Sequence, residues 1–461
     1  MSTPPPGLAL AGGTAGPDAL RPLLAIVLAA LTDGAAARGG PIPRGGPEAV
    51  ASRVREAVEP VLPDHGTGAE EALRTLVRTV AHGAADPADP LCAAHLHTPP
   101  LALAVAADLA ASALNPSLDS WDQAPAASEL EATVGRTLAA EVFPHGRDPD
   151  ALVTTGGTES NQLGLLLARE RHGTVQVICG SAAHHSLHRA AWLLGLPEPV
   201  TVPSPAGVLD LAALDEALTE LPGPRIVAAT AGTTDTGRID PLPEIADLCH
   251  RHGAELHVDA AYGGPMLFSE RHRTKLNGLD RAHSVTLDLH KLGWQPVAAG
   301  LLAVPNGALL APLAVRADYL NADDDTEAGL PDLLGRSLRT TRRPDILKVA
   351  VTLRALGRSG LAALVDRTCA AAQHLADLLE KHQSLELYER PTLTTVLFRP
   401  YVATDEETAD IRRTLLAEGR AVLGRARADG RLWLKATLLN PHATQGDLEA
   451  LLELVEGSTP R

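Results

Sequence analysis

The feature that most constrains this chain is a series of short apolar segments that alternate with helical segments between residues 102 and 346. The strand-like segments include VQVICG, RIVAAT, ELHVDAAY and HSVTLDL, and the helical segments include ESNQLGLLLARERH and LPEIADLCHRHG. This alternation is typical of a mostly parallel sheet with helices on both faces. We therefore expect an α/β domain whose ligand lies at the carboxyl ends of the strands.

The segments on either side of this domain have different patterns. Residues 1–101 alternate Pro/Gly-rich breaks with helical patterns and contain no strand-like run, which predicts a helical segment that packs against something else. Residues 347–461 combine long helices with the strand-like TTVLFRP and LWLKATLL, which predicts a small α+β domain. The apolar run at 23–31 is too short to span a bilayer, so we expect an amphipathic helix there.

Charge, cysteine and histidine content argue against several classes of function. The formal net charge is -16 and no basic run is dense, which argues against nucleic acid or an anionic membrane as a partner. The four cysteines lie far apart without a CxxC pair, so we expect neither disulfides nor a thiolate metal site, and a cytoplasmic location. The 18 histidines show no HExxH or comparable spacing, so we expect no metal.

Three features at expected strand ends carry the chemistry. Gly157 and Thr158 precede a helix, where they either cap it or place its free N–H groups around a phosphate. Asp259 ends an apolar run, and a buried carboxylate needs a partner. Lys291 follows the next such run, and it is either a solvated strand-end residue or a lysine whose charge has been removed chemically.

Pyridoxal phosphate explains these three features together. Its phosphate suits a helix N-terminus, its pyridinium nitrogen suits a buried carboxylate, and its aldehyde forms a Schiff base with a lysine. Lys291 can then be buried, because as an imine it is no longer a free ammonium. The sequence therefore predicts a pyridoxal-phosphate site.

Further motifs carry a resemblance to a family. TTGGTESN, SAAHHSLHRA, TAGTTDTGRIDPLPEIA, HVDAAYGG and LDLHK resemble motifs of the group II pyridoxal-phosphate decarboxylases of fold type I. The segments 115–131, 336–348 and 434–441 are most similar to the bacterial enzymes that act on lysine, ornithine or 2,4-diaminobutyrate. The resemblance implies that the chain converts an amino acid to an amine and carbon dioxide.

The resemblance also implies the site residues. Lys291 would form the Schiff base, Asp259 would pair with the pyridinium nitrogen and His184 would stack on the ring, although the residues alone leave His184 and His185 equally suited. The other cofactor contacts would be Ala261 beneath the ring, Thr233 near it, Gly157, Thr158 and His290 at the phosphate, and Thr341 from a partner chain. Active sites of this family lie at a dimer interface, so the resemblance implies a homodimer whose first hundred residues wrap the other subunit.

One departure from the family concerns the proton donor. Many relatives supply a tyrosine from a mobile loop, whereas residues 321–337 contain no tyrosine or phenylalanine, and Tyr319 fits a different family position. His184 or Lys291 would then have to donate the proton, and the enzyme could instead deaminate its substrate oxidatively to an aldehyde. The motifs are also compatible with a glutamate or aromatic amino acid decarboxylase, with another fold type I transferase or lyase, and with a non-catalytic homologue.

The expected pocket favours a diamino acid as substrate. His95, Leu96 and His97 stand where aromatic-specific relatives carry aromatic side chains, and aromatic residues make up only 2% of the chain. Asp119 and Asp122 either face a distal ammonium or serve as solvated or helix-capping residues.

Overall fold

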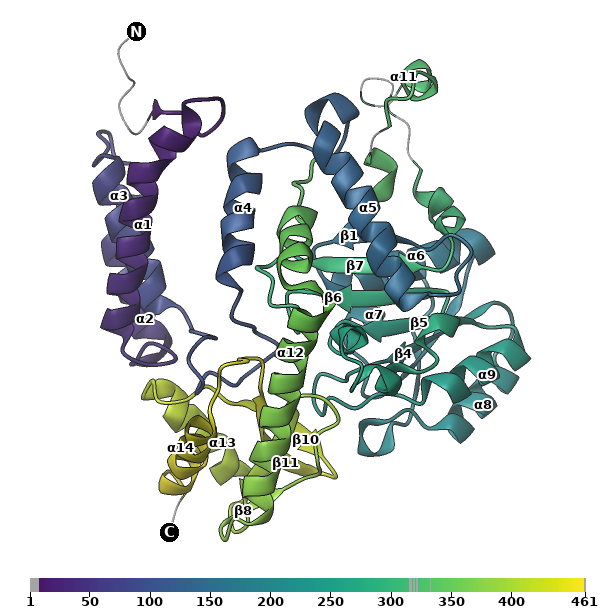
Figure 1. The fold of residues 1–461 in the computed structure, drawn as a ribbon. Helices are drawn as coiled ribbons and strands as arrows, with labels where there is room; N and C mark the ends of the chain where they lie inside the picture. Colours follow the sequence, from purple (N-terminus) through teal and green to yellow (C-terminus); the bar gives the residue numbers. More distant parts are fainter. Residues whose placement is uncertain (1–7, 315–316, 318–319, 321, 332, 460–461) are drawn as a thin grey trace.

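A seven-stranded sheet forms the centre of the molecule (Figure 1). The computed structural model describes residues 8–314, 317, 320, 322–331 and 333–459. The strands are β1 (Asp150–Thr154), β2 (Gln176–Gly180), β3 (Val200–Val202), β4 (Arg225–Thr230), β5 (Glu255–Ala260), β6 (Ser284–Asp288) and β7 (Gly300–Val304), in the order β1-β7-β6-β5-β4-β2-β3. Neighbours from β6 to β3 pair in parallel, and β7 is antiparallel to both β1 and β6. The predicted mostly parallel sheet is therefore confirmed.

Helices cover both faces of this sheet. Helices α6 (Gly157–His172) and α7 (Ser186–Leu193) lie on one face, and α5 (Pro125–Val142), α8 (Leu211–Glu220), α9 (Leu242–His252) and the first part of α12 (Ile346–Glu380) lie on the other. Along β5, Leu256 and Val258 belong to the core under α8 and α9, whereas His257 and Asp259 bond to a residue of α6. Alternate side chains of a strand point to opposite faces, so the α6 side of β5 is polar although it is buried.

Short 3-10 helices and one further α-helix complete the described connections. They are η2 (Trp121–Gln123), η3 (Pro205–Gly207), η4 (Gly264–Phe268), η5 (Arg273–Leu276), η6 (Leu279–Arg281), η7 (Gly307–Leu313), α11 (Asp323–Glu327) and η8 (Leu334–Arg336).

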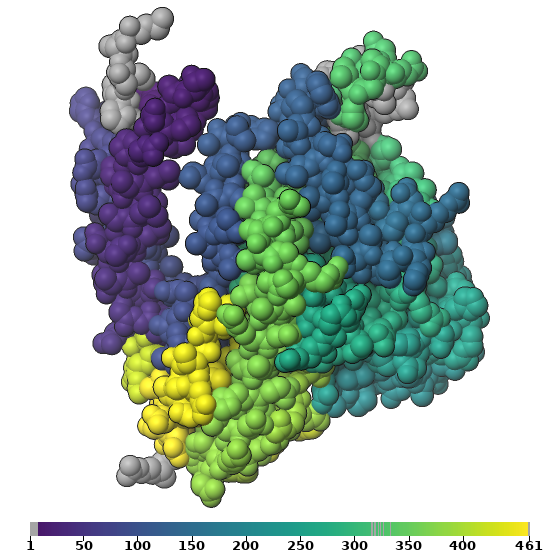
Figure 2. Space-filling model, viewed as in Figure 1, coloured from purple at the N-terminus to yellow at the C-terminus, as the bar shows by residue number. Residues whose placement is uncertain are grey.

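The N-terminal region contains α1 (Gly16–Arg38), α2 (Gly46–Val58), α3 (Ala69–Gly83) and α4 (Ala102–Leu114). Helices α1 to α3 form an arm, and Figure 2 shows a gap between this arm and α4. A helix is present at the apolar run 23–31, as expected, but residues on both sides of the run continue it to 23 residues. By length and composition this helix could cross a membrane, a test that buried core helices and N-terminal signal sequences also pass. It packs along α3, where a Cβ added at Gly34 would lie 2.5 Å from Ala81 Cβ.

The C-terminal region contains a second, antiparallel sheet. Its strands β8 (Leu385–Leu387), β9 (Thr395–Pro400), β10 (Gly424–Ala428) and β11 (Arg431–Thr437) are arranged in the order β10-β11-β9-β8, with α13 (Asp405–Ala417) and α14 (Gln445–Gly457) packed against them. This matches the predicted small α+β domain. The expected boundaries at 101 and 346 fall next to the first residues of α4 and α12, and α12 continues from the large region into the small one.

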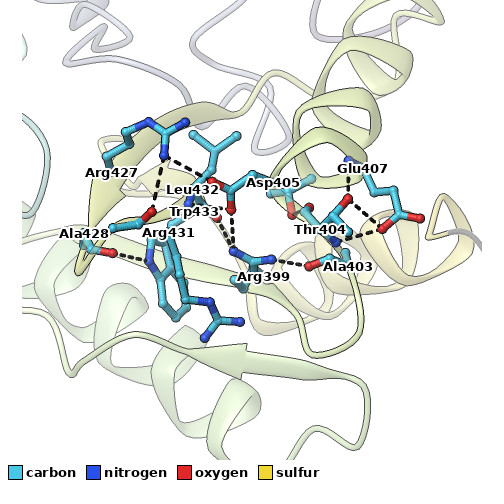
Figure 3. Close-up of polar contacts among 12 residues, drawn as sticks. Arg399, Ala403, Thr404, Asp405, Glu407, Arg427, Ala428, Arg431, Leu432 and Trp433 are labelled. Atoms are coloured by element: carbon cyan, nitrogen blue, oxygen red, sulfur yellow. Dashed lines mark hydrogen bonds and ion pairs between the residues drawn. The ribbon is translucent and has the colours of Figure 1, made fainter.

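Arg399 joins the small sheet to the helix that covers it (Figure 3). Its guanidinium is buried and donates to Asp405 Oδ1 at 3.0 Å and to the carbonyl oxygen of Leu432 at 2.9 Å. Asp405 Oδ2 also accepts from Arg427 at 3.1 Å, and Thr404 caps α13 with Glu407 in a reciprocal capping box. The start of α13 is therefore fixed to β9, β10 and β11.

Candidate active site

A cavity of about 400 Å³ lies at the carboxyl ends of β4, β5 and β6, where an open α/β sheet places its ligand. Its lining brings together strand ends, the start of α6 and the turn after β6. The lining residues are Leu96, Thr155, Gly156, Gly157, Thr158, His184, Thr230, Gly232, Thr234, Asp259, Ala261, Tyr262, Asp288, His290 and Lys291.

The start of α6 approaches the cavity through its backbone. A Cβ added at Gly157 would lie 3.0 Å from Ala261 Cβ and 3.2 Å from Asp288 Oδ2, so glycine lets the helix lie this close without displacing either neighbour. The N–H groups of a first helical turn have no partner within the helix and carry partial positive charge. Gly157 and Thr158 thus lie where an anion such as a phosphate would be bound.

Asp259 is buried, and two protein groups orient its carboxylate. Oδ1 accepts from the Ala261 backbone N–H at 3.1 Å, and Oδ2 accepts from Asn161 Nδ2 at 2.8 Å. The carboxylate lines the cavity, so it presents negative charge to a ligand there.

Lys291 forms an ion pair at the end of β6. Its Nζ lies 2.9 Å from Asp288 Oδ2, and its side chain is 19% exposed. His290 Nε2 lies 3.5 Å from the same oxygen. Burial lowers the pKa of His290, and the Asp288 carboxylate opposes that shift. Asp288 Oδ1 is buried without a hydrogen-bond partner among the described residues.

His184 lines the cavity and is partly buried, whereas His185 is exposed and does not line it. The Nδ1 atom of His184 lies 2.9 Å from Ser186 Oγ. Burial lowers the pKa of His184, with Asp259 acting in the opposite direction. Of the two histidines that the residues left open, the structure therefore places His184 at the site.

Two residues expected at the cofactor do not line the cavity in the single chain. Thr233 is buried, and its hydroxyl lies 2.8 Å from that of Thr236, while Gly232 and Thr234 provide the lining on either side of it. Thr341 is exposed and lies outside the lining.

Only one of the residues expected to select the substrate lines the cavity. Leu96 lines the cavity, but His95 and His97 do not, and Asp119 and Asp122 also lie outside the lining. Asp119 is buried and accepts from Gln123 at 2.7 Å, and Asp122 accepts from Ser120 at 2.6 Å. Within one chain these carboxylates therefore have local partners. Tyr319 and residues 321 and 332 of the segment 321–337 lie outside the described residues.

Sequence reasoning missed several residues of the site, of which three carry polar contacts or a large part of the wall. Asp288 pairs with Lys291, Tyr262 lines the cavity, and Asn161 bonds to Asp259. Polar residues at alternate positions of HVD and SVTLD were the available signal, because they predict one polar face on strands that are otherwise apolar.

The residues present fit pyridoxal phosphate. One cavity contains a lysine amine, a buried carboxylate and a helix start at which a side chain would block close approach. Thr230 Oγ1 and Asp288 Oδ1 are buried beside it and lack partners among the described residues, which leaves polar atoms available to a ligand. The fold and this site define an enzyme of the α/β class that uses pyridoxal phosphate.

The particular family follows from comparison with known proteins. Residues 52–401 match the family model of the pyridoxal-dependent decarboxylase conserved domain, and the chain belongs to this family. It is 41% identical to an L-2,4-diaminobutyrate decarboxylase of Rhizobium meliloti, over 87% of this chain and 84% of that one. It is 32% identical to an enzyme of the same name from Acinetobacter baumannii, over 86% and 85% of the two chains.

Solved structures agree with this assignment. A structure described as the glutamate decarboxylase domain of diaminobutyrate-pyruvate transaminase and L-2,4-diaminobutyrate decarboxylase from Vibrio parahaemolyticus superimposes with a TM-score of 0.86 at 31% identity, covering 97% of each chain. The chain is therefore a pyridoxal-phosphate-dependent carboxy-lyase that acts on an amino acid, and the fold and cofactor predictions are confirmed.

Proposed function

We propose that the enzyme decarboxylates a diamino acid, with L-2,4-diaminobutyrate as the first choice. The observation that carries this proposal is the 41% identity to an enzyme named for that substrate over 87% of the chain. The described lining supports it, because it contains no arginine that would bind the distal carboxylate of an acidic amino acid.

The cavity residues divide the work in this proposal. When bound, pyridoxal phosphate supplies the electron sink for the bond to the substrate carboxylate. Asp259 would hold the ring nitrogen and stabilise its positive charge, and the start of α6 would hold the phosphate. Lys291 supplies the amine that holds the cofactor, and Asp288, 2.9 Å away, holds that amine in place.

The proton step falls to residues of this chain that reach the cavity. His184 lies on its wall, and its Nδ1 faces Ser186, which leaves Nε2 as the atom that exchanges a proton. Lys291 is the other candidate donor. Leu96 and Tyr262 add apolar surface that limits water around the reacting atoms.

The cofactor assignment has a direct test. Borohydride reduction of the purified holoenzyme should fix the cofactor covalently, and peptide mapping should find the label on Lys291. Label on another lysine would refute the role of Lys291.

The substrate assignment needs a panel of amino acids. Carbon dioxide, amine, aldehyde and oxygen uptake should be followed together for 2,4-diaminobutyrate, ornithine, lysine, glutamate, aspartate and tyrosine. We expect kcat/KM to be highest for a diamino acid, with amine as the product. Preference for an acidic or aromatic substrate would reject the substrate proposal, and stoichiometric aldehyde with oxygen uptake would assign the enzyme to oxidative deamination.

We also propose that the active unit is a homodimer. Apolar side chains of the arm and of α4 are exposed in the single chain, including Leu28 (64%), Val80 (67%) and Val105 (47%). An apolar surface of this kind is typical of a subunit interface. The exposed position of Thr341 supports a site completed by the partner. Light scattering coupled to gel filtration should give twice the mass of one chain, and a fully active monomer would contradict the proposal.

A further inference from the structure

Strands β5 and β6 carry a buried polar face under α6. His257 and Asp259 are two residues apart on β5, and Ser284 and Thr286 occupy the paired positions on β6. All four are buried. Buried polar groups are costly unless they are paired, so this face needs a partner on the helix above it.

Helix α6 supplies that partner through one small-polar-small stripe. Gly157, Asn161 and Gly164 are spaced by four and three residues and therefore share a face. A Cβ added at Gly164 would lie 2.7 Å from His257 Nδ1. The glycines bring the helix close enough for the single amide of Asn161 to reach both strands.

The amide of Asn161 can have only one orientation. The carboxylate oxygens of Asp259 only accept, so the group 2.8 Å from Asp259 Oδ2 is the NH2 of Asn161. Its second hydrogen goes to Ser186 Oγ, also at 2.8 Å. The carbonyl Oδ1 therefore faces the strands, where it accepts from Thr286 Oγ1 at 2.7 Å and from His257 Nε2 at 3.0 Å.

This orientation fixes the proton of His257. Because Asn161 Oδ1 accepts, Nε2 of His257 carries a hydrogen. Burial lowers the pKa of His257 to about 4, so the ring is neutral and Nδ1 is bare. Nδ1 then accepts from the hydroxyl of Ser284, which lies 2.8 Å away.

The hydrogen bonds continue from Asn161 through Ser186 to His184 on the cavity wall. Ser186 Oγ already accepts from Asn161, so its own hydrogen points to His184 Nδ1 at 2.9 Å. The backbone N–H of Ser186 donates to the same nitrogen at 3.3 Å. His184 Nδ1 is therefore an acceptor, and the hydrogen of the neutral ring lies on Nε2.

We propose that Asn161 is a positioning residue that orients Asp259 and, through Ser186, keeps the hydrogen of His184 on Nε2. Asn161 touches neither the cavity nor the reacting atoms. It acts through the two residues that the proposed function places at the cofactor ring, so the inference rests on that function.

The test replaces Asn161 in two ways. Asn161→Leu removes donor and acceptor together, and we expect kcat to fall on the order of 100-fold, because small misplacement of a reacting group is costly. Asn161→Asp keeps an acceptor for His257 and Thr286 and restores the donor only while the introduced carboxyl is protonated. Burial and the neighbouring Asp259 carboxylate raise the pKa of that carboxyl.

The charged surroundings of position 161 define the expected pH profile. Two titratable groups of β5, Asp259 and His257, face residue 161, and His184 lies beyond Ser186. On β6 the neighbours are the neutral Ser284 and Thr286, and Asp288 lies nearer the cavity. Below the raised pKa the introduced carboxyl donates to Asp259, and above it two negative charges meet. The ratio of Asn161→Asp to parental kcat should therefore fall as the pH rises.

A matched control and a second readout separate positioning from folding. Ser160 is the buried neighbour on α6, with its hydroxyl 2.7 Å from that of Thr154, and Ser160→Ala should keep the parental pH profile. In cofactor-free protein with ¹⁵N-labelled histidine, the protected Nε2–H signal of His257 should persist in Asn161→Asp and be lost in Asn161→Leu. His257→Gln, which keeps a donor near that position, should retain more activity than His257→Leu.

The outcomes are distinct. The role of Asn161 is wrong if the ratio of Asn161→Asp to parental kcat does not change with pH. It is also wrong if Nε2 of His184 carries no hydrogen in the parental protein. If Asn161→Leu does not fold, the role of Asn161 is still tested by the pH dependence of kcat for Asn161→Asp and by the parental histidine signals. Parental protein that retains no pyridoxal phosphate would instead reject the proposed function. This failure is distinguishable from a failure of the Asn161 proposal, because the histidine signals are measured without cofactor.

Discussion

At the scale of single residues, the site depends on where each charge is balanced. Lys291 has its charge matched by Asp288 at 2.9 Å, and Asp259 is oriented from behind by Asn161 and Ala261. The face of Asp259 that lines the cavity is therefore available to a cation.

Asp259→Asn should keep the fold and lose most of kcat, because an amide cannot stabilise a protonated ring nitrogen. Asp259→Glu should retain more activity, since the carboxylate is preserved at a shifted position. Steady-state kinetics with saturating cofactor measures both variants. Turnover of the asparagine variant at the parental rate would contradict the role of Asp259.

His257 should make stability depend on pH. Its pKa is lowered from 6.5 to about 4 in the folded chain, so the unfolded chain takes up a proton first as the pH falls. The free energy of unfolding should therefore drop by about 2 kcal/mol between about pH 7 and about pH 5 from this residue alone.

His257→Gln removes the titrating group and supplies the comparison. Denaturant unfolding at fixed protein concentration should show the gap between parent and variant narrowing as the pH is lowered. A constant gap would show that His257 titrates normally in the folded state.

At the scale of elements, α6 combines two tasks. Its first turn meets the cavity, and its glycine-asparagine-glycine face lies against β5 and β6. Small residues are required on this face because the helix lies close to polar strand residues. Replacing a glycine there by a better helix former would therefore cost more in packing than it gains in helix propensity.

Gly164→Ala should therefore destabilise the protein by about 2 kcal/mol through overpacking, although alanine is the better helix former. A Cβ at this position meets both Nδ1 of His257 at 2.7 Å and Ser284 Oγ at 3.3 Å. Gly446→Ala in α14 is the matched control, because the nearest atom to its Cβ is 3.9 Å away. Thermal unfolding should separate the two variants, and equal midpoints would refute the packing argument.

For the molecule as a whole, the arm of α1 to α3 is the part that exposes apolar side chains such as Leu28 and Val80 in the single chain. Its helices pack mainly on one another and join the small domain at their base, where Gly45 N–H donates to the Ala417 carbonyl oxygen at 3.0 Å. The gap beside α4 in Figure 2 leaves apolar side chains of both uncovered.

Removal of residues 1–101 should expose further apolar surface and give aggregated or inactive protein. A finer test is Val80→Glu, which should weaken the dimer because it places a charge on a surface that is 67% exposed in the single chain. Val402→Glu, at a residue of the small domain that is 82% exposed, should leave the dimer intact. Gel filtration at several concentrations distinguishes them, and an active monomeric truncation would reject the interface.

The sequence by itself determined the α/β class, the cofactor and the strand-end positions of Asp259 and Lys291. Those features follow from local periodicity and from residue types that have few uses at a strand end, so neighbouring residues suffice to predict them. The family motifs added His184, which residue patterns alone could not separate from His185.

Only the tertiary structure decided which groups meet. Asn161 and Asp259 are 98 residues apart and come into contact because the helix packs over one strand register. The position of Thr233, which is buried but does not line the cavity, is likewise a property of the folded chain. Most buried polar atoms are paired because an unpaired one is costly, and which partner each atom meets is a property of the folded chain and not of a sequence window.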